Sequence, residues 1–278
     1  MSKIKLIITN KPKNKFLVCV KNAFAHTFSA FSRALYPNNI KCLCCGKDLK
    51  TKQDIEICDV CLNMLTFIPE TSCCKKCGSF ITGSGDYCFN CMDNKREFDA
   101  GRSVVVFKDL AQELVHSFKF GAKPYIKNTL GNLMTNKLLS LGWKFDVIVP
   151  VPVSKKRLKQ RGYNQAYLLG EVISKNLDVP VLNDVLIKAK ETLDQVGLNF
   201  NDRQENLKGS IKVNNSQHLK DKTVLLVDDV ITTGATSSIC AKALKQAGAK
   251  CVYVISFANV QDKIHTEKNA ETKQKNKK

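Results

Sequence analysis

The fold is decided by the stretch VLLVDDVITTGAT, residues 224–236. Four apolar residues run directly into Asp228 and Asp229, and a small, hydroxyl-rich turn follows. A buried strand that leads through such a turn into a helix is typical of the carboxyl edge of an open α/β sheet, where these folds bind ligands. The helix expected from about Thr236 would direct free N–H groups and a partial positive charge at the turn. The stretch therefore predicts a phosphate-binding turn.

The turn and the two acids carry the groups that a sugar phosphate requires. Gly234 lets the backbone approach a phosphate closely, and the threonine hydroxyls add donors. The carboxylates of Asp228 and Asp229 suit the vicinal diol of the attached sugar, so we interpret them as the ribose-binding and candidate catalytic pair. The predicted phosphate loop consists of Val230, Ile231, Thr232, Thr233, Gly234, Ala235 and Thr236. The Gly-Lys-Thr core of the mononucleotide P-loop is absent from it.

Outward from this stretch, apolar β-branched segments alternate with amphipathic segments of helical period. This alternation predicts a parallel or mostly parallel sheet with helices on both faces. A polar span at residues 190–209 interrupts it. The expected strands lie at residues 104–107, 146–152, 185–189, 224–227 and 251–258, and the expected helices at 109–120, 126–142, 166–177 and 236–248.

The sequence holds 13 cysteines, and eight of them form four Cys-x-x-Cys pairs. Two intervening residues let a tight turn point both sulfurs at one ion, and a second such turn completes a tetrahedron. The pairs therefore predict two structural zinc sites, with redox dithiols and buried thiols as the alternatives. The pairs could combine consecutively or interleave. The predicted metal ligands are Cys42, Cys45, Cys58, Cys61, Cys74, Cys77, Cys88 and Cys91.

Two further sets of residues refine the picture of this cysteine module. Gly46 and Gly78 each follow the second cysteine of a pair, where a knuckle turn requires positive φ. Cys44 and Cys73 stand beside ligand cysteines and could compete for the metal. Zinc binding of about 10–16 kcal/mol would supply most of the folding energy of such a small module.

Composition restricts the location and the partners. No apolar run approaches the ~20 residues of a membrane span, and the first residues lack the features of a signal peptide, so we expect a cytoplasmic protein without stable membrane insertion. The formal net charge is +19, and two tetrathiolate zinc sites would each subtract two units, leaving about +15. This charge indicates a polyanionic partner.

Composition also divides the chain into four expected segments. Residues 1–41 are basic, and apolar residues at helical spacing predict an amphipathic helix at about 15–36, which covers a neighbouring domain or, alternatively, binds a membrane surface. Residues 42–98 form the double zinc module, and residues 99–260 form the α/β domain. Residues 261–278 are expected to be a disordered basic tail.

Residues 224–236 resemble the phosphoribosyl pyrophosphate (PRPP) motif of type I phosphoribosyltransferases. Together with FDVIVPVPVSKKRLKQRGYNQA at residues 145–166 and the cysteine pairs, they resemble the ComF family, which is associated with competence for DNA uptake. The resemblance covers roughly residues 37–260. It implies a type I phosphoribosyltransferase-like fold preceded by a small four-cysteine zinc module.

The resemblance also implies further site residues. The loop after Pro152 takes the position of the pyrophosphate loop, and Mg²⁺ would bridge the diphosphate and ribose oxygens of PRPP. The span at residues 190–209 matches the flexible loop that closes over PRPP. The residues expected to contact the diphosphate or to belong to these loops are Ser154, Lys155, Lys156, Arg157, Arg161 and Arg203.

Three functions fit these residues. The first is a competence protein that binds PRPP and single-stranded DNA during natural transformation. The second is an active phosphoribosyltransferase of nucleotide metabolism, and the third is a non-catalytic adaptor for a competence helicase or another DNA-processing protein. The module's Lys75, Lys76, Phe80, Tyr87 and Phe89 either contact nucleic acid or pack the module. Turnover and acceptor stay open at this point.

Overall fold

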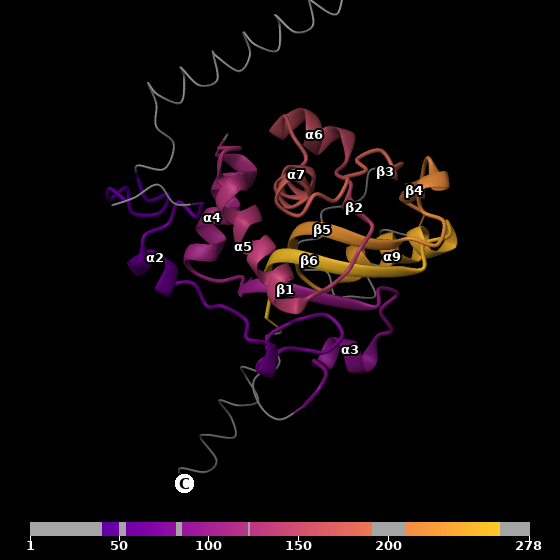
Figure 1. Ribbon diagram of the computed structural model, residues 1–278, viewed down its shortest axis with the longest axis horizontal. Coiled ribbons are helices and arrows are strands. Elements are labelled where there is room, and N and C mark those ends of the chain that lie inside the picture. Colours follow the sequence, from indigo (N-terminus) through magenta and orange to yellow (C-terminus); the bar gives the residue numbers. More distant parts are fainter. Residues whose placement is uncertain (1–40, 50–53, 82–84, 122, 191–208, 262–278) are drawn as a thin grey trace, which may run out of the picture.

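The computed structural model describes residues 41–49, 54–81, 85–121, 123–190 and 209–261. Its centre is a four-stranded sheet of order β1-β6-β5-β2, in which all neighbouring strands are parallel (Figure 1). The predicted parallel sheet is therefore confirmed. The strands are β1 (Ala100–Val106), β2 (Val147–Pro150), β5 (Thr223–Ile231) and β6 (Cys251–Asn259).

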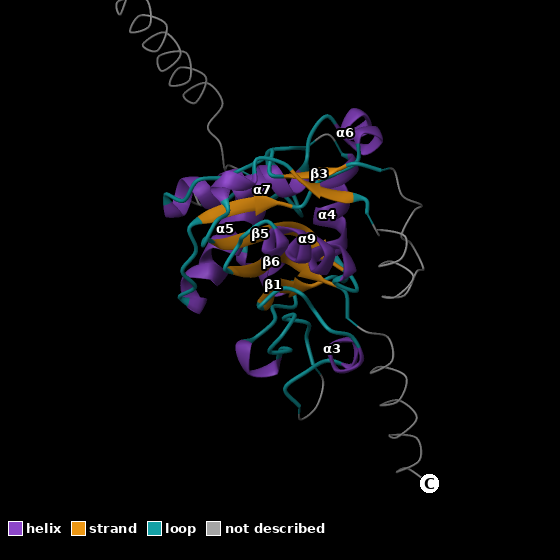
Figure 2. Ribbon diagram, turned by 90° about the vertical axis from the view of Figure 1, so that its right-hand side faces the viewer, coloured by secondary structure: helices purple, strands orange, loops and turns teal. Residues whose placement is uncertain are grey.

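Helices cover both faces of the sheet, as the sequence predicts. Leu225 and Val227 of β5 pack with α4, α5 and α7, whereas Val224 and Leu226 pack with α9 on the other face. Successive side chains of a strand point to opposite faces, so one apolar run serves both layers. Figure 2 shows the sheet between these layers. The helices are α4 (Leu110–Phe120), α5 (Ile126–Leu141), α7 (Gln165–Leu177) and α9 (Ala235–Gln246).

Three elements differ from the expectation. Strand β5 continues through both acids to Ile231 instead of ending at Val227. The segment after Pro152, expected to be a loop, forms helix α6 (Lys155–Arg161), because the Ser154 side chain caps it by accepting a hydrogen bond from the Arg157 N–H. A short antiparallel pair joins β3 (Leu186–Lys188) to the unpredicted β4 (Ile211–Val213).

The cysteine module contributes only short elements, which are α2 (Asp59–Asn63), η1 (Glu70–Ser72) and α3 (Phe89–Asp93); η2 (Ser216–His218) belongs to the α/β part. Helix α3 lies beyond the β1 edge of the sheet (Figure 2). Among the described residues, no helix is long and apolar enough to span a membrane. The helix predicted at 15–36 and nearly all of the predicted tail lie outside the described residues.

Candidate sugar-phosphate site and metal centres

Two segments far apart in the sequence meet at the carboxyl edge of the sheet. Strand β2 pairs with β5, and Pro150 lies opposite Val227, so the residues that follow each strand face one another. They enclose a cavity of about 300 Å³. Eight predicted site residues line it, namely Ser154, Arg157, Arg161, Asp228, Asp229, Val230, Thr232 and Thr236.

The two acids lie in an electrostatically unusual setting. Asp229 is only 6% exposed, and its Oδ2 lies 3.1 Å from Nζ of Lys119. The Asp229 N–H donates a hydrogen bond of 2.8 Å to Oδ1 of Asp228. Burial, reinforced by the neighbouring Asp229 charge, raises the pKa of Asp228 to about 8, and Lys119 only partly opposes this. Near neutral pH the Asp228 carboxyl can therefore either donate to or accept from a ligand hydroxyl.

The turn after β5 is shaped by Gly234. This residue has φ +76° and caps α9, whose Ser238 N–H donates to the Gly234 carbonyl at 2.9 Å. Oγ1 of Thr233 accepts a hydrogen bond of 3.4 Å from the Ala235 N–H. Thr233, Gly234 and the buried Ile231 and Ala235 belong to the turn and the core and do not line the cavity. Thr232 and Thr236 bring the hydroxyl groups to the cavity wall.

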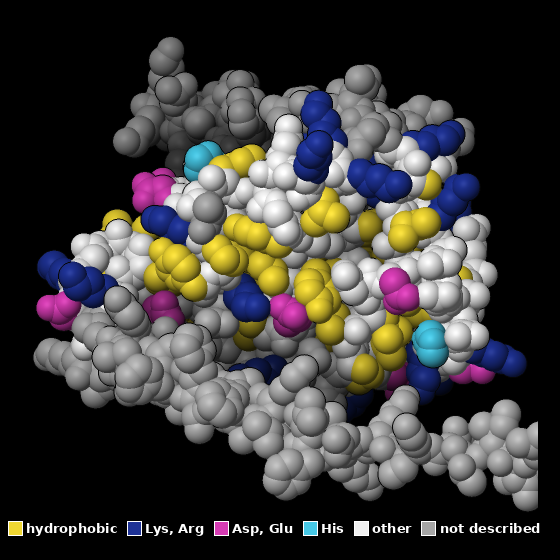
Figure 3. Space-filling model, turned by 90° about the horizontal axis from the view of Figure 1, so that it is seen from above, with side chains coloured by type: hydrophobic (Ala, Val, Ile, Leu, Met, Phe, Trp, Pro, Cys, Tyr) yellow, Lys and Arg dark blue, Asp and Glu magenta, His cyan; other side chains and the backbone are white. Residues whose placement is uncertain are grey.

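Helix α6 brings basic side chains to the opposite wall. Nη1 of Arg161 donates to Oε1 of Gln165 at 3.2 Å, and the Arg161 guanidinium lies 4.8 Å from the centroid of the Phe120 ring. Burial, with the nearby Arg157 charge, lowers the pKa of Arg161. Lys155 and Lys156 lie exposed on α6 and do not line the cavity. Figure 3 shows lysine and arginine side chains on the face that carries α6. Arg203 lies outside the described residues.

The cavity includes residues that the sequence did not single out. Gln165 is 2% exposed, and within the described part of the chain its Nε2 finds no hydrogen-bond partner, which leaves a donor for a ligand. Asn164 and Gln165 belong to the motif RGYNQA, which could have indicated them as site residues. No sequence pattern indicated Lys119, because its partner Asp229 is brought to it only by tertiary packing. The additional lining residues include Phe107, Lys119, Asn164, Gln165 and Lys188.

The eight paired cysteines form two clusters, and in each the four sulfurs lie within 4.8 Å of one another. Consecutive pairs combine, which settles the choice that the spacing left open. The first cluster consists of Cys42, Cys45, Cys58 and Cys61, and the second cluster of Cys74, Cys77, Cys88 and Cys91. Cys44 and Cys73 belong to neither cluster.

The donor set of each cluster fits zinc. Four cysteine sulfurs around one point suit a tetrahedral structural zinc ion with no open coordination position. In the second cluster, hydrogen bonds from the neighbouring thiols, Cys77 foremost, lower the pKa of Cys74 and favour its thiolate, the form that binds metal. The predicted knuckle turns are confirmed, since Gly46 and Gly78 have φ of +72° and +73°.

The two knuckle glycines allow a matched test. A Cβ at Gly46 would meet nothing within 4 Å, whereas a Cβ at Gly78 would lie 2.6 Å from the Cα of Arg102 and the carbonyl oxygen of Gly101. Both alanine variants carry the strain of positive φ, roughly 1–2 kcal/mol. We expect Gly78→Ala to lower the melting temperature much more than Gly46→Ala does, because the added methyl group also pushes the turn of Cys74 and Cys77 away from β1. Equal losses in calorimetry would contradict this close approach.

Two protein-family comparisons define the class. Residues 119–278 match the phosphoribosyl transferase domain, and residues 31–92 match the double zinc ribbon domain. The chain thus combines a type I phosphoribosyltransferase fold with an N-terminal double zinc ribbon.

Similar proteins narrow this class to one family. Competence protein F of Haemophilus influenzae is 31% identical over 229 residues, covering 79% of this chain and 97% of that protein. DNA utilization protein YhgH of Escherichia coli is 28% identical, covering 71% and 88%. Competence protein ComFC of Bacillus subtilis is 30% identical, covering 56% and 62%. The chain belongs to the family of competence protein F, the ComF family predicted from its motifs.

Proposed function

We propose that this chain binds PRPP in the cavity at the end of β5 and handles single-stranded DNA during DNA uptake. The observation that carries the proposal is the meeting of paired carboxylates, a hydroxyl-bearing turn and two arginines around one cavity of about 300 Å³. The ribose would lie against Asp228 and Asp229, and its 5′-phosphate against the turn at residues 232–236. The diphosphate would then lie toward Arg157 and Arg161.

The same cavity suits Mg²⁺ carried by the diphosphate. Mg²⁺ prefers oxygen ligands and is commonly held by one or two carboxylates together with substrate phosphates. Asp229 already forms an ion pair with Lys119, so Asp228 is the carboxylate that would face the metal. When bound, the ion would neutralise the charge of the diphosphate, while the ion pair with Lys119 would hold Asp229 in place.

Calorimetry with PRPP, with and without Mg²⁺, tests the proposal. We expect the wild type to bind, and Asp229→Ala to lose roughly 100-fold or more in affinity, because a buried acceptor for the ribose hydroxyls disappears and Lys119 is left without its ion pair. The matched control is Glu113→Ala, which removes an exposed acid of α4 outside the cavity and should bind like the wild type. A wild type that ignores PRPP would remove the ligand assignment and leave the zinc clusters standing.

Single-stranded DNA is the proposed macromolecular partner, supported by the net charge of +19 and by relatives named for competence and DNA utilization. On the second zinc ribbon, Tyr87 is 50% exposed and Phe89 40% exposed, which suits stacking with bases. Phe80 instead packs against Ile68 and Val106, so it is a structural residue.

We expect Tyr87→Ala and Phe89→Ala each to weaken binding of a labelled oligothymidylate, by about 1–3 kcal/mol per stacked base. Fluorescence anisotropy over a salt series measures this, and Phe67→Ala is the control, since Phe67 is also exposed, at 42%, but lies outside the second ribbon. A loss equal to that of the control would exclude a stacking role.

An active phosphoribosyltransferase is the second candidate, favoured by the pKa of Asp228, which allows proton exchange near neutral pH. Release of pyrophosphate from PRPP with some acceptor would support it. An adaptor that keeps the fold only as a scaffold would instead tolerate combined replacement of Asp228 and Asp229 in a transformation assay.

A further inference from the structure

The connector that leaves the second cluster runs directly against the start of α9, the helix that follows the phosphate turn. The Glu97 N–H donates a hydrogen bond of 3.1 Å to Oγ of Ser238, a fully buried residue in the first turn of α9. The preceding residue, Arg96, is only 5% exposed. A buried arginine is rare unless its charge is matched by specific partners.

Arg96 contacts the metal cluster and lies beside the turn. Its Nε donates to Sγ of Cys91 at 3.5 Å, and its Nη2 donates to the carbonyl oxygen of Asn90 at 3.3 Å. On the other side, a Cβ built on Gly234 would lie 3.7 Å from both Cζ and Nη1 of Arg96. One guanidinium therefore spans from a zinc-ligand sulfur to the glycine that shapes the proposed phosphate site.

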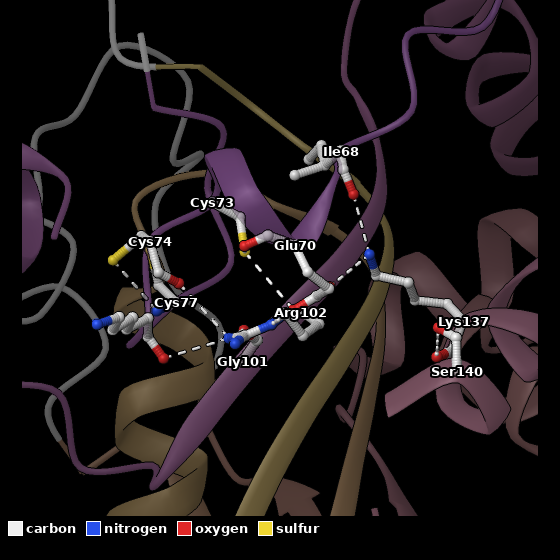
Figure 4. A network of polar contacts seen from close by, with 10 residues as sticks. Ile68, Glu70, Cys73, Cys74, Cys77, Gly101, Arg102, Lys137 and Ser140 are labelled. Atoms are coloured by element: carbon white, nitrogen blue, oxygen red, sulfur yellow. Dashed lines mark hydrogen bonds and ion pairs between the residues drawn. The ribbon is translucent and has the colours of Figure 1, made fainter. Parts of the chain in front are cut away.

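The second cluster is itself braced against the sheet. Arg102 of β1 donates from Nη1 to the carbonyl oxygens of Cys74 at 3.5 Å and Lys75 at 3.2 Å, and from Nε to Oε2 of Glu70 at 2.7 Å. Oε1 of Glu70 lies 2.6 Å from Nζ of Lys137 on α5. Figure 4 shows this network between the knuckle, β1 and α5. The cluster is thus a fixed support against which a side chain can hold the turn.

The first cluster is attached elsewhere. The Glu56 N–H donates to Oγ1 of Thr129 at 3.0 Å, and Nδ2 of Asn132 donates to the carbonyl oxygen of Asp54 at 2.6 Å, so its ribbon packs on α5. The two metal centres therefore support different parts of the α/β domain.

We infer that Arg96 is a positioning residue that couples the second metal centre to the phosphate turn. Four thiolates and one zinc ion carry a net charge of about −2, so the cluster is the anionic partner that keeps a buried guanidinium in place. The held guanidinium fixes Gly234 and adds positive potential beside a turn that would receive a phosphate. The coupling predicts that metal at the second cluster, and not at the first, orders the turn. Its effect on PRPP affinity rests on the proposed function.

Hydrogen exchange on the zinc-loaded full chain tests the coupling without any ligand. We expect Arg96→Met to speed exchange of the amides at residues 232–238 about tenfold, a typical size for coupling between two sites. Arg96→Lys should behave similarly, because it keeps the charge but loses the forked contact. The control is Lys75→Met, which removes an exposed ion pair with Asp86 on the same ribbon and should leave these amides unchanged. Unchanged exchange in Arg96→Met would overturn the inference.

A second measurement tests the coupling in the opposite direction, from the bound ligand to the metal cluster. With both clusters loaded with ¹¹³Cd, adding PRPP and Mg²⁺ should shift the cadmium resonance of the second cluster and leave the resonance of the first cluster unchanged. A Cys45→His variant identifies which resonance belongs to the first cluster. Calorimetry on the same sample separates the two proposals. PRPP that binds without moving the second resonance refutes the coupling alone, whereas PRPP that fails to bind refutes the ligand assignment and leaves hydrogen exchange to decide the coupling.

Discussion

Stripping zinc from the 278-residue chain with a chelator is expected to unfold the cysteine module and to lower the melting temperature of the chain. Among the described residues of the module, the buried apolar side chains other than cysteine are Ile57, Leu65, Ile68, Ile81 and Phe98. The buried thiols of Cys42, Cys61, Cys74, Cys77 and Cys88 form much of the rest of its interior. Without a cation, no bond holds the four sulfurs of each cluster within 4.8 Å of one another. A structural zinc site of this type contributes about 10–16 kcal/mol of binding free energy.

The loss of melting temperature should be larger when only the second cluster is emptied than when only the first cluster is emptied. Cys77→Ser removes a ligand of the cluster that is tied to β1 and α5 through Arg102 and Glu70, whereas Cys45→Ser removes an exposed ligand of the first cluster. Calorimetry together with a colorimetric zinc assay measures stability and stoichiometry on the same samples. If the chain binds two zinc ions but chelation leaves its melting temperature unchanged, the zinc ions do not have a structural role.

Asp228→Asn is expected to abolish PRPP binding and, at the same time, to stabilise the fold. Burial opposes ionisation of Asp228, so replacing its carboxyl with a neutral amide removes that cost, and the amide oxygen can still accept the Asp229 N–H. Each kcal/mol recovered raises the melting temperature by about 2–4 °C in a domain of this size. Asp229→Asn should instead destabilise, because it leaves the half-buried Lys119 without its ion pair. Differential scanning fluorimetry with and without PRPP separates the two effects.

The same carboxyl gives a pH dependence of stability. The folded-state pKa of Asp228, about 8, lies above the unfolded value of about 3.9. The contribution of Asp228 to the free energy of unfolding is therefore fully present below the unfolded-state pKa and is lost as the pH rises through the folded-state pKa of about 8. The wild type should lose stability between about pH 4 and pH 8 relative to Asp228→Asn, and the difference should level off above pH 8. Parallel stability curves for the two proteins would show that Asp228 does not titrate in this window.

The sequence predicts best what local patterns determine. The zinc ligands and the knuckle glycines follow from spacing, and the β5–α9 turn follows from the order of apolar, acidic and hydroxyl residues. Helix α6 was missed because its basic sequence KKRLKQR resembles a solvated loop, and only the cap at Ser154 and the left-handed Gly162 delimit it. The role of Lys119 could not be predicted because its partner Asp229 lies more than a hundred residues away. Arg96 has hydrogen-bond partners nearby in the sequence, Cys91 and Asn90, but its approach to the distant Gly234 could not be predicted. Strand β4, three residues long, is too short to show a period.

The pairing of β1 with β6 has a consequence for biosynthesis. Ala100 lies opposite Tyr253, so the earliest strand of the sheet to leave the ribosome has to wait for the last one. Contacts this distant along the chain slow folding, and the unpaired edge stays open to other strands meanwhile. Both metal-binding ribbons are complete long before that moment and can take up their ions at once. A nascent chain would therefore carry finished zinc ribbons ahead of an unfinished sheet. Premature termination before β6 would release a metal-loaded fragment that lacks the strand joining β1 to β5.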